Sequence, residues 1–308
     1  MKAIMYHYVQ KYDPHFPNFR FLDFNNFIKQ LDFFGDNNGF VTHDEWLTYI
    51  NCGVMPEKKG KVVLTFDDGM ICQYKYVYPE LIKRKLWGIF YVPSMPYLEK
   101  KILDVHKIHL LIGKSSGSEL MKILSKVLTE EMIPFKKRKE FREHTYIAQN
   151  EGNETSEFKR ILNYYIGDKF RSEVINEILE KLNVNLNETE FYIPEINLKE
   201  MSDNGMIIGS HTNSHPVMSK LNYEEQKNEL TVSFSFIKKI IDEKKLTYCH
   251  PYGGFHSFSK DTTSLLDELG AAYSFNVENR EIDENDRLKN KHCLPRFDCN
   301  LFPYGKIT

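Results

Sequence analysis

The chain alternates short apolar runs with longer amphipathic segments over most of its length. KVVLTF, residues 61–66, carries an unbroken apolar run that is typical of a strand covered on both faces, and so do LWGIFYVPS (86–94) and MIIGS (206–210). DFNNFIKQLDFFGDN (23–37) instead repeats its aromatic and aliphatic residues at helical intervals. This alternation predicts an α/β fold with a parallel sheet.

Further stretches extend the alternation toward both ends of the chain. The first segment, Ala3 to Val9, reads as a short buried strand with His7 near its end, and Val77–Lys85 reads as a helix. The later elements are a helix that ends at Gly205, a helix over 223–242, a strand that runs into YCHPYGGF (248–255), a helix over 260–270 and a strand over 271–277. About six or seven strand and helix units result, which comes close to a barrel.

The pattern changes between about residues 99 and 190, where the sequence is charged and shows few strand signals. Three stretches there have the helical period: 118–132, 158–170 and 171–184. We expect one domain over 1–308 with a mainly helical insertion at about 99–190. Within the insertion, EGNETSE (151–157) has the composition of an exposed loop.

The bulk composition excludes several classes of function. With 41 basic and 43 acidic side chains, the net charge of −2 creates no field that would recruit nucleic acid or an anionic membrane. No apolar run approaches the roughly 18 residues of a membrane helix. Five cysteines without a CxxC pair favour neither a disulfide framework nor a thiolate zinc site. The start, MKAIMYHYVQ, is too short and too polar for a signal-peptide core, so we expect a soluble cytoplasmic protein.

Two adjacent carboxylates, Asp67 and Asp68, directly follow the apolar strand KVVLTF. Asp-Asp-Gly is a common turn in open water, but in a half-buried site the two charges repel and need a cation. His211 and His215 follow another strand, and Pro251–Gly253 follows a third. The carboxyl ends of parallel strands share one face, so these groups should converge.

Two imidazoles and one carboxylate form a three-ligand site with open positions, which suits catalytic zinc and also non-haem iron. The second aspartate can then take a proton from an attacking water molecule, which is the logic of hydrolysis. Non-haem iron chemistry would give the second aspartate no role, and this disfavours it.

The ordered set TFDDG (65–69), SHTNSH (210–215), PYG (251–253) and LPRF (294–297) resembles the polysaccharide deacetylases of the NodB-homology type, carbohydrate esterase family four, in a branch that ends in LPR. The resemblance covers nearly all of the chain outside the insertion. It implies a distorted (β/α) barrel of seven strands. It also implies a divalent metal, Zn²⁺ first, with Co²⁺, Ni²⁺ or Fe²⁺ as alternatives.

The resemblance also implies roles for individual residues. Asp67 would be the general base, and Asp68, His211 and His215 would bind the metal. The backbone N–H of Tyr252 would help to stabilise the oxyanion of a tetrahedral intermediate.

Two positions depart from the family pattern. Cys249 stands where the family often has an arginine that orients the base, and Arg296 stands where it usually has a histidine as general acid. Arg296 could therefore orient Asp67 or bind substrate. The general acid then stays open among three histidines: His256, His7 and His292.

Together these features predict a metal-dependent hydrolase that removes the N-acetyl group from an amino sugar. The expected substrate is a cytoplasmic glycan precursor, such as a nucleotide-linked or lipid-linked amino sugar. Two alternatives are a related C–N hydrolase that acts on a cyclic imide or another non-sugar amide, and an inactive barrel that serves as a binding subunit. The insertion could close over the ligand, mediate dimerisation or only pack, and a homo-oligomer stays possible.

Overall fold

The computed structural model describes residues 1–141, 154–241 and 246–307. The chain divides into two compact units: residues 1–11, 21–101 and 188–308 form the first, and residues 12–20 and 102–187 form the second. The second unit matches most of the predicted helical insertion. The description of residues 1–308 as one domain stays a prediction.

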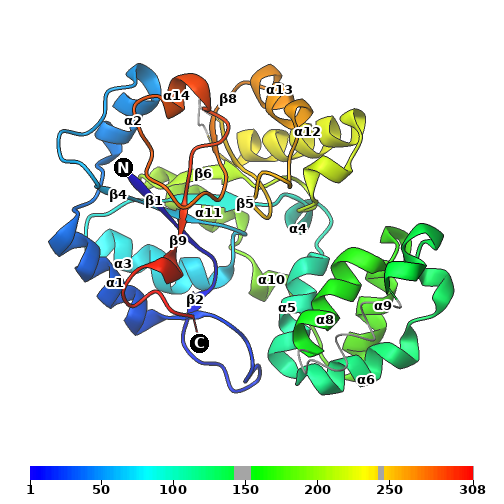
Figure 1. Ribbon diagram of the computed structural model, residues 1–308. Helices are drawn as coiled ribbons and strands as arrows, with labels where there is room; N and C mark the ends of the chain where they lie inside the picture. The colour runs from blue at the N-terminus through cyan, green and yellow to red at the C-terminus, as the bar shows by residue number, and fades with distance from the viewer. Residues whose placement is uncertain (142–153, 242–245, 308) are drawn as a thin grey trace. The chain divides into compact units, whose positions relative to one another are not determined.

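Seven strands of the first unit form one parallel sheet that curls into a distorted (β/α) barrel, which confirms the predicted fold class (Figure 1). Their order is β8-β7-β6-β5-β4-β1-β9. The strands are β1 (Lys2–Tyr6), β4 (Val62–Phe66), β5 (Ile89–Val92), β6 (Ile207–Ser210), β7 (Leu246–Cys249), β8 (Ala271–Phe275) and β9 (Phe297–Asp298). A separate pair, β2 (Val9–Gln10) and β3 (Leu22–Asp23), is also parallel.

The segment 294–298 spans the two edges of this sheet. Leu294 forms a parallel bridge with Phe275 of β8, and three residues later Phe297 pairs with Ile4 of β1. This closing segment therefore bridges β8, the strand at one edge, and β1, and its own β9 forms the opposite edge. Arg296 lies within it and is almost fully buried, with 1% of its surface exposed.

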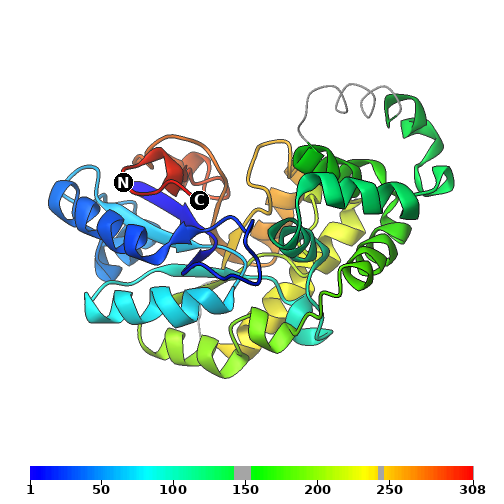
Figure 2. The same cartoon turned by 90° about the horizontal axis from the view of Figure 1, so that it is seen from below.

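Helices cover the outside of the sheet (Figures 1 and 2). Those of the first unit are α1 (Phe24–Asn37), α2 (His43–Cys52), η1 (Gln73–Val77), α3 (Tyr78–Lys83), α4 (Met95–Leu98), α10 (Glu188–Phe191), α11 (Glu195–Asp203), η5 (Met218–Lys220), α12 (Tyr223–Ile240), α13 (Lys260–Glu268), α14 (Asp286–Lys289) and η6 (Cys299–Leu301). Several begin at the residue types that cap helices well. Thr42 and Glu45 form a capping box on α2, and Asn222 and Glu225 form another on α12.

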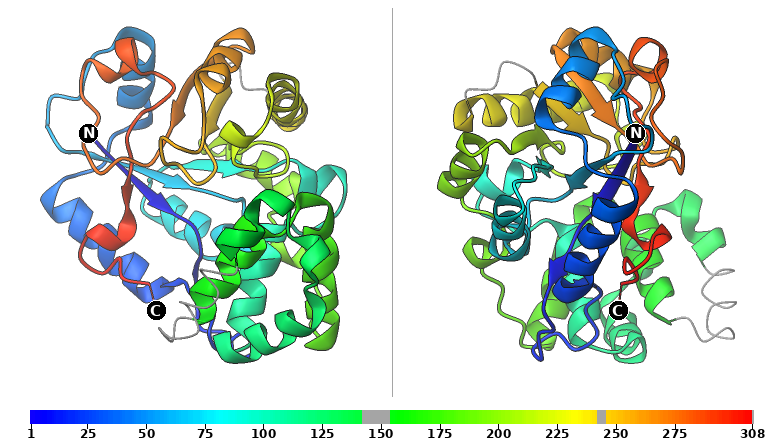
Figure 3. Two further views of the ribbon diagram at one scale, coloured as in Figure 1. Left: turned by 45° about the vertical axis from the view of Figure 1, so that its right-hand side comes forward. Right: turned by 90° about the vertical axis from the view of Figure 1, so that its left-hand side faces the viewer.

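The face of the sheet that packs against the surrounding helices is apolar and strongly aromatic. The rings of Tyr6, Phe66 and Phe90 stack across β1, β4 and β5, with centroid distances of 5.2 Å and 4.7 Å. These three side chains are fully buried, as the unbroken apolar runs predict. Figure 3 shows the strands and the helices around them from two further sides.

The second unit is helical and has its own apolar core. Its elements are α5 (Asp104–Lys114), α6 (Gly117–Val127), η2 (Glu130–Met132), η3 (Phe135–Lys137), α8 (Glu154–Arg160), η4 (Ile161–Tyr165) and α9 (Asp168–Lys181). The predicted helices over 118–132 and 171–184 are confirmed at their centres. The predicted loop 151–157 is wrong where it can be compared: residues 151–153 lie outside the described residues, and 154–157 belong to α8.

Two boundaries in the first unit also differ from the prediction. The strand expected over Ala3 to Val9 is two strands, because Tyr8 accepts a hydrogen bond from Leu22 and the chain turns to pair with β3. The helix expected over Val77–Lys85 begins earlier, as the π-helix η1, and ends at Lys83.

Candidate active site

The predicted site residues come from four places in the chain, three at the carboxyl ends of strands and one directly before β9. Asp67 and Asp68 follow β4, His211 and His215 follow β6, and Tyr252 follows β7. The fourth place is the closing segment 294–298, which supplies Arg296. Strand order alone brings them close, since β4, β5, β6 and β7 are neighbours in the sheet.

Backbone strain is concentrated in these loops. Of the eight described residues other than glycine with a positive φ, four lie here: Asp68 (77°), Thr212 (65°), His215 (61°) and Tyr252 (62°). Such conformations cost of order 1–3 kcal/mol each and persist only where the surroundings enforce them. The strain sits on residues that carry the predicted chemistry, which marks the region as a functional site.

Asp68, His211 and His215 form a cluster of three possible metal ligands. The Nε2 atoms of His211 and His215 each lie 3.5 Å from Oδ1 of Asp68, and all three side chains are buried. His211 Nδ1 lies 2.8 Å from the carbonyl oxygen of Cys249. A carbonyl only accepts, so Nδ1 donates and Nε2 keeps the lone pair that a metal needs.

The protonation state of His211 also suits a metal ligand. Burial lowers the pKa of its imidazole, in spite of the nearby carboxylates of Asp67 and Asp68. The ring is therefore neutral over a wider pH range than an exposed histidine. Neutral imidazole is the form that binds a divalent cation. The donor set of two imidazoles and one carboxylate fits zinc and related transition metals.

Asp67 is held by a buried guanidinium group. Arg296 Nη1 donates to Asp67 Oδ1 at 2.7 Å, and Nη2 donates to Oδ2 at 2.8 Å. Burial alone would raise the pKa of Asp67, but the charge and hydrogen bonds of Arg296 outweigh it and hold that pKa below its usual value. Asp67 is therefore an ionised carboxylate next to the Asp68–His211–His215 cluster.

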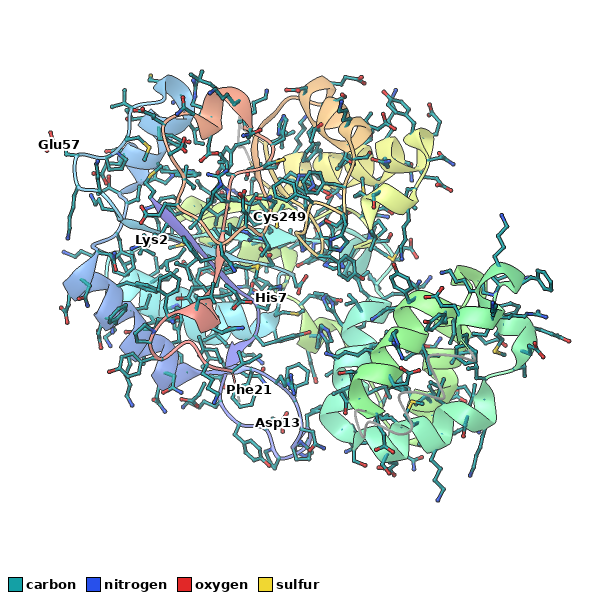
Figure 4. All side chains as sticks on the ribbon, viewed as in Figure 1. Lys2, His7, Asp13, Phe21, Glu57 and Cys249 are labelled. Carbon is teal, nitrogen blue, oxygen red and sulfur yellow. The ribbon has the colours of Figure 1, made fainter. Side chains whose placement is uncertain are left out.

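Cys249, the last residue of β7, adds a thiol to this pair (Figure 4). Its Sγ lies 2.9 Å from Arg296 Nη2 and 3.5 Å from Asp67 Oδ2. Asp67, His211 and Cys249 also form a possible metal cluster by distance. A cation there would meet the guanidinium of Arg296, which already binds both oxygens of Asp67, so the cluster of Asp68, His211 and His215 is the better metal site.

The sequence pattern of the polysaccharide deacetylase family matches residues 55–274, which is more than half of the chain. The chain belongs to the polysaccharide deacetylase family. As a member of this family it is a carbohydrate de-N-acetylase, a hydrolase, as the sequence predicts. Among the described residues, every helix is too short or too polar to serve as a membrane span.

Several solved structures have a similar fold. A deacetylase of Streptococcus pyogenes, PplD in complex with acetate, is 16% identical over 97% of this chain and 91% of that chain, with a TM-score of 0.58. A de-N-acetylase of Aggregatibacter actinomycetemcomitans is 16% identical over 96% and 93%, with a TM-score of 0.52. IcaB of Ammonifex degensii is 16% identical over 89% and 82%, with a TM-score of 0.51. At this identity the likeness shows the fold alone. No curated protein matches in sequence.

Tyr252 lies on a tight turn beside the cluster of Asp68, His211 and His215. Its ring centroid is 5.1 Å from that of His215, and 46% of its surface is exposed. The turn is fixed by hydrogen bonds from Gly253 N to the His250 carbonyl and from Gly254 N to the Tyr252 carbonyl. The backbone of Tyr252 is therefore held in the turn, and its partly exposed ring lies at the edge of the site.

The three histidines predicted as candidate acids lie in different surroundings. His7 follows β1 (Figure 4) and is close enough to Asp67 that its charge lowers the pKa of Asp67. His256 is exposed, in the loop after the Tyr252 turn. The ring of His292 lies 3.2 Å from Asp267 and 3.3 Å from the hydroxyl of Ser274, and neither residue belongs to the site.

Three residues of the site were not singled out from the sequence. Gln73 donates from Nε2 to the carbonyl oxygens of both Asp67 and His7, at 2.6 Å and 3.0 Å. Burial and the charge of Asp68 raise the pKa of the Tyr8 hydroxyl well above its usual value. Glu229, on α12, accepts hydrogen bonds from the loop between His211 and His215. No local pattern marks these residues: Gln73 begins the π-helix η1, Tyr8 lies between β1 and β2, and Glu229 lies within α12.

Proposed function

We propose that this chain is a divalent-metal-dependent enzyme that hydrolyses the N-acetyl amide of an amino sugar and releases acetate and a free amine. The observation that carries the proposal is the buried cluster of Asp68, His211 and His215 next to an ionised Asp67. The two adjacent aspartates have different partners. Asp68 faces two imidazoles, and Asp67 faces a guanidinium, so they can do different chemistry.

Asp68, His211 and His215 would hold the cation, with Zn²⁺ as the first choice and Co²⁺, Ni²⁺ or Fe²⁺ as alternatives. When bound, the cation supplies Lewis acidity to the acetamide carbonyl and to water. Asp67 would accept the proton of the attacking water, and the low pKa of Asp67 keeps it ready to do so over most of the pH range.

Arg296 would orient Asp67 and is not the general acid. Burial lowers the pKa of its guanidinium, but the charge of Asp67 more than reverses this, so the pKa of Arg296 ends above its usual value. A guanidinium does not release its proton in a protein. The backbone N–H of Tyr252 would stabilise the oxyanion, and the acid for the leaving amine stays a prediction among His7, His256 and His292.

The substrate would be an acetylated amino sugar, as a glycan precursor or conjugate, met in the cytosol. Free, buried thiols such as that of Cys249 are compatible with a reducing compartment. One structural relative is described in complex with acetate, which is the product expected here. Acetylated sugar nucleotides are the first substrates to screen, with release of free amine as the readout.

Metal analysis and three variants test the proposal. Wild-type protein should hold about one transition-metal ion per chain, and Asp68→Ala or His211→Ala should lose it. Asp67→Asn should keep the metal and lose turnover by about 10² or more. Full activity in Asp67→Asn would contradict the role of Asp67. A wild-type chain without metal or acetate release, or one that opens ring amides instead, would contradict the function.

A further inference from the structure

A buried carboxylate lies beneath the loop that joins His211 and His215. Glu229, on α12, accepts hydrogen bonds from the backbone N–H groups of Asn213 and Ser214 at 2.9 Å and 2.8 Å, both on Oε2. The hydroxyl of Ser214 donates to Oε1 at 2.6 Å. The carboxylate thus binds three donors of the loop, while only 9% of the Glu229 surface is exposed.

The loop needs such support because of its backbone conformation. Thr212 and His215 both have a positive φ, at 65° and 61°. A conformation of this kind persists only when the surroundings enforce it. Two carbonyls of the loop accept hydrogen bonds from the start of α4: Ser94 N donates to Thr212 at 3.2 Å, and Met95 N donates to Asn213 at 3.0 Å. Glu229 supports the N–H side of the same loop.

The position of Glu229 is itself fixed by the packing of α12 on β6. Ser233 lies one helical turn further along α12, and its hydroxyl is 2.7 Å from that of Ser210, the last residue of β6. His211 follows Ser210 directly. The same helix face therefore contacts the strand that carries His211 and the loop that carries His215.

We propose that Glu229 is a positioning residue for the metal site: through the 211–215 loop it sets the geometry of the two histidines and so the affinity for the cation. The inference rests on the proposed function, because it assumes that His211 and His215 bind the metal. Charge-assisted hydrogen bonds to backbone N–H groups are about twice as strong as neutral ones. The role of Glu229 is therefore to hold a strained loop in the conformation that binds metal, before any metal arrives.

Two substitutions separate hydrogen bonding from charge. Glu229→Ala removes every contact with the loop and should lower the affinity for Zn²⁺ by about 10- to 100-fold, the usual effect of losing a partner that orients metal ligands. Glu229→Gln keeps an amide oxygen for the two N–H groups but loses the charge, so its affinity should lie between those of wild type and Glu229→Ala. Glu224→Gln is the matched control, because Glu224 is exposed on the same helix.

The affinity is measured by titration of the metal-free proteins with Zn²⁺ against a competing chelator, and folding by thermal denaturation without metal. Activity adds a second readout: excess Zn²⁺ should restore kcat in the Glu229 variants without a change in KM. A purely structural role would lower the stability of the metal-free protein and leave the Zn²⁺ affinity of its folded fraction unchanged. If Glu229→Ala does not fold, the Zn²⁺ affinity of Glu229→Gln is the test of the inference.

Loss of a residue that positions metal ligands should lower the Zn²⁺ affinity by at least about tenfold in the alanine variant. If the folded Glu229 variants bind Zn²⁺ within about twofold of wild type, the inference is overturned and the proposed metal site still stands. A wild-type protein that binds no metal would instead overturn the proposed function. The two failures are therefore distinct.

Discussion

Arg296 binds both carboxylate oxygens of Asp67, and the side chains of the pair are only 1% and 3% exposed. A planar guanidinium matches a carboxylate in this two-bond arrangement, which fixes orientation as well as distance. The three remaining donors of Arg296 are also used, by the Thr65 hydroxyl at 3.2 Å, the Asn276 carbonyl at 3.1 Å and the Cys249 sulfur at 2.9 Å. The guanidinium of Arg296 is therefore itself fixed by hydrogen bonds, and it holds the Asp67 carboxylate in one orientation.

Substitution of Arg296 should damage both activity and folding. Arg296→Lys keeps the charge but cannot form two parallel bonds, so kcat should fall by about 10² or more if Asp67 is the base. Arg296→Met leaves a buried carboxylate without its cation, which should lower the free energy of unfolding by about 3–5 kcal/mol. Kinetics on a confirmed substrate and urea denaturation measure the two effects.

Arg280→Lys is the matched control for this pair. Arg280 also binds a carboxylate with two bonds, to Asp286 at 2.7 Å each, but it is about one-third exposed. Its replacement should cost about 1 kcal/mol or less and leave kcat unchanged. If Arg296→Lys behaved like Arg280→Lys, Arg296 would have no orienting role.

The strands that carry the site could be predicted because each is a local pattern. KVVLTF and MIIGS are apolar throughout, and a parallel sheet buries both faces of such strands. Once the strands are parallel, topology places the residues that follow them on one face. These two steps were sufficient to predict that four residues lie together: Asp67, Asp68, His211 and His215.

The position of Arg296 depends on two contacts that no local pattern encodes. Its segment has only β9, two residues long, and it reaches the barrel interior because Leu294 pairs with β8 and Phe297 with β1. Both partners are remote in sequence. The sequence therefore left two roles open for Arg296, and only the closed barrel shows that it contacts Asp67.

The thiols should differ sharply in reactivity. Cys52 is exposed and Cys293 is half-buried with a thiol pKa that burial raises to about 11, whereas Cys72, Cys249 and Cys299 are buried. Burial also raises the pKa of the Cys249 thiol, so little reactive thiolate forms. The native protein should show one fast-reacting thiol toward a disulfide reagent, and Cys52→Ser should remove it. Peptide mapping that finds Cys249 labelled as fast as Cys52 would contradict the buried arrangement of β7.

Gly209, on β6 two residues before His211, should not tolerate a side chain. A Cβ there would lie 2.5 Å and 2.6 Å from ring carbons of Tyr91 and 2.8 Å from the Thr247 methyl group. Tyr91 is fully buried and its hydroxyl is 2.9 Å from that of Thr247, so the ring cannot move aside easily. Gly209→Ala should lower the free energy of unfolding by about 1–3 kcal/mol through overpacking.

Gly205→Ala separates this steric effect from backbone strain. Gly205 has a φ of 86°, and a Cβ there would meet nothing within 4 Å. Strain alone should cost about 1–2 kcal/mol. Gly205→Ala should also leave metal binding unchanged, whereas Gly209→Ala should weaken it because β6 carries His211. Equal metal affinity in the two variants would show that β6 absorbs the methyl group without moving its end.

His250 should make the stability depend on pH. Burial lowers the pKa of its imidazole to about 3, although the hydrogen bond to the His292 carbonyl opposes this shift. The ring also stacks on Phe258 at 3.8 Å, so it has little access to water. An unfolded histidine titrates near pH 6.5, so between about pH 6.5 and 3 the unfolded chain binds a proton that the folded chain does not.

The sign follows from that difference in bound protons. As pH falls from about 6.5 toward 3, His250 should lower the free energy of unfolding by up to about 1.4 kcal/mol per pH unit, and above 6.5 its contribution is flat. His250→Gln can still donate a hydrogen bond to the His292 carbonyl. It should reduce the dependence of the free energy of unfolding on pH by the contribution of His250. Urea denaturation from pH 7.5 to 4.5 measures it, with His256→Gln, at an exposed histidine, as the control. Burial also lowers the pKa of His211 and His292, but these contribute equally to both proteins. Identical slopes for wild type and His250→Gln would show that the His250 ring is hydrated in the folded protein.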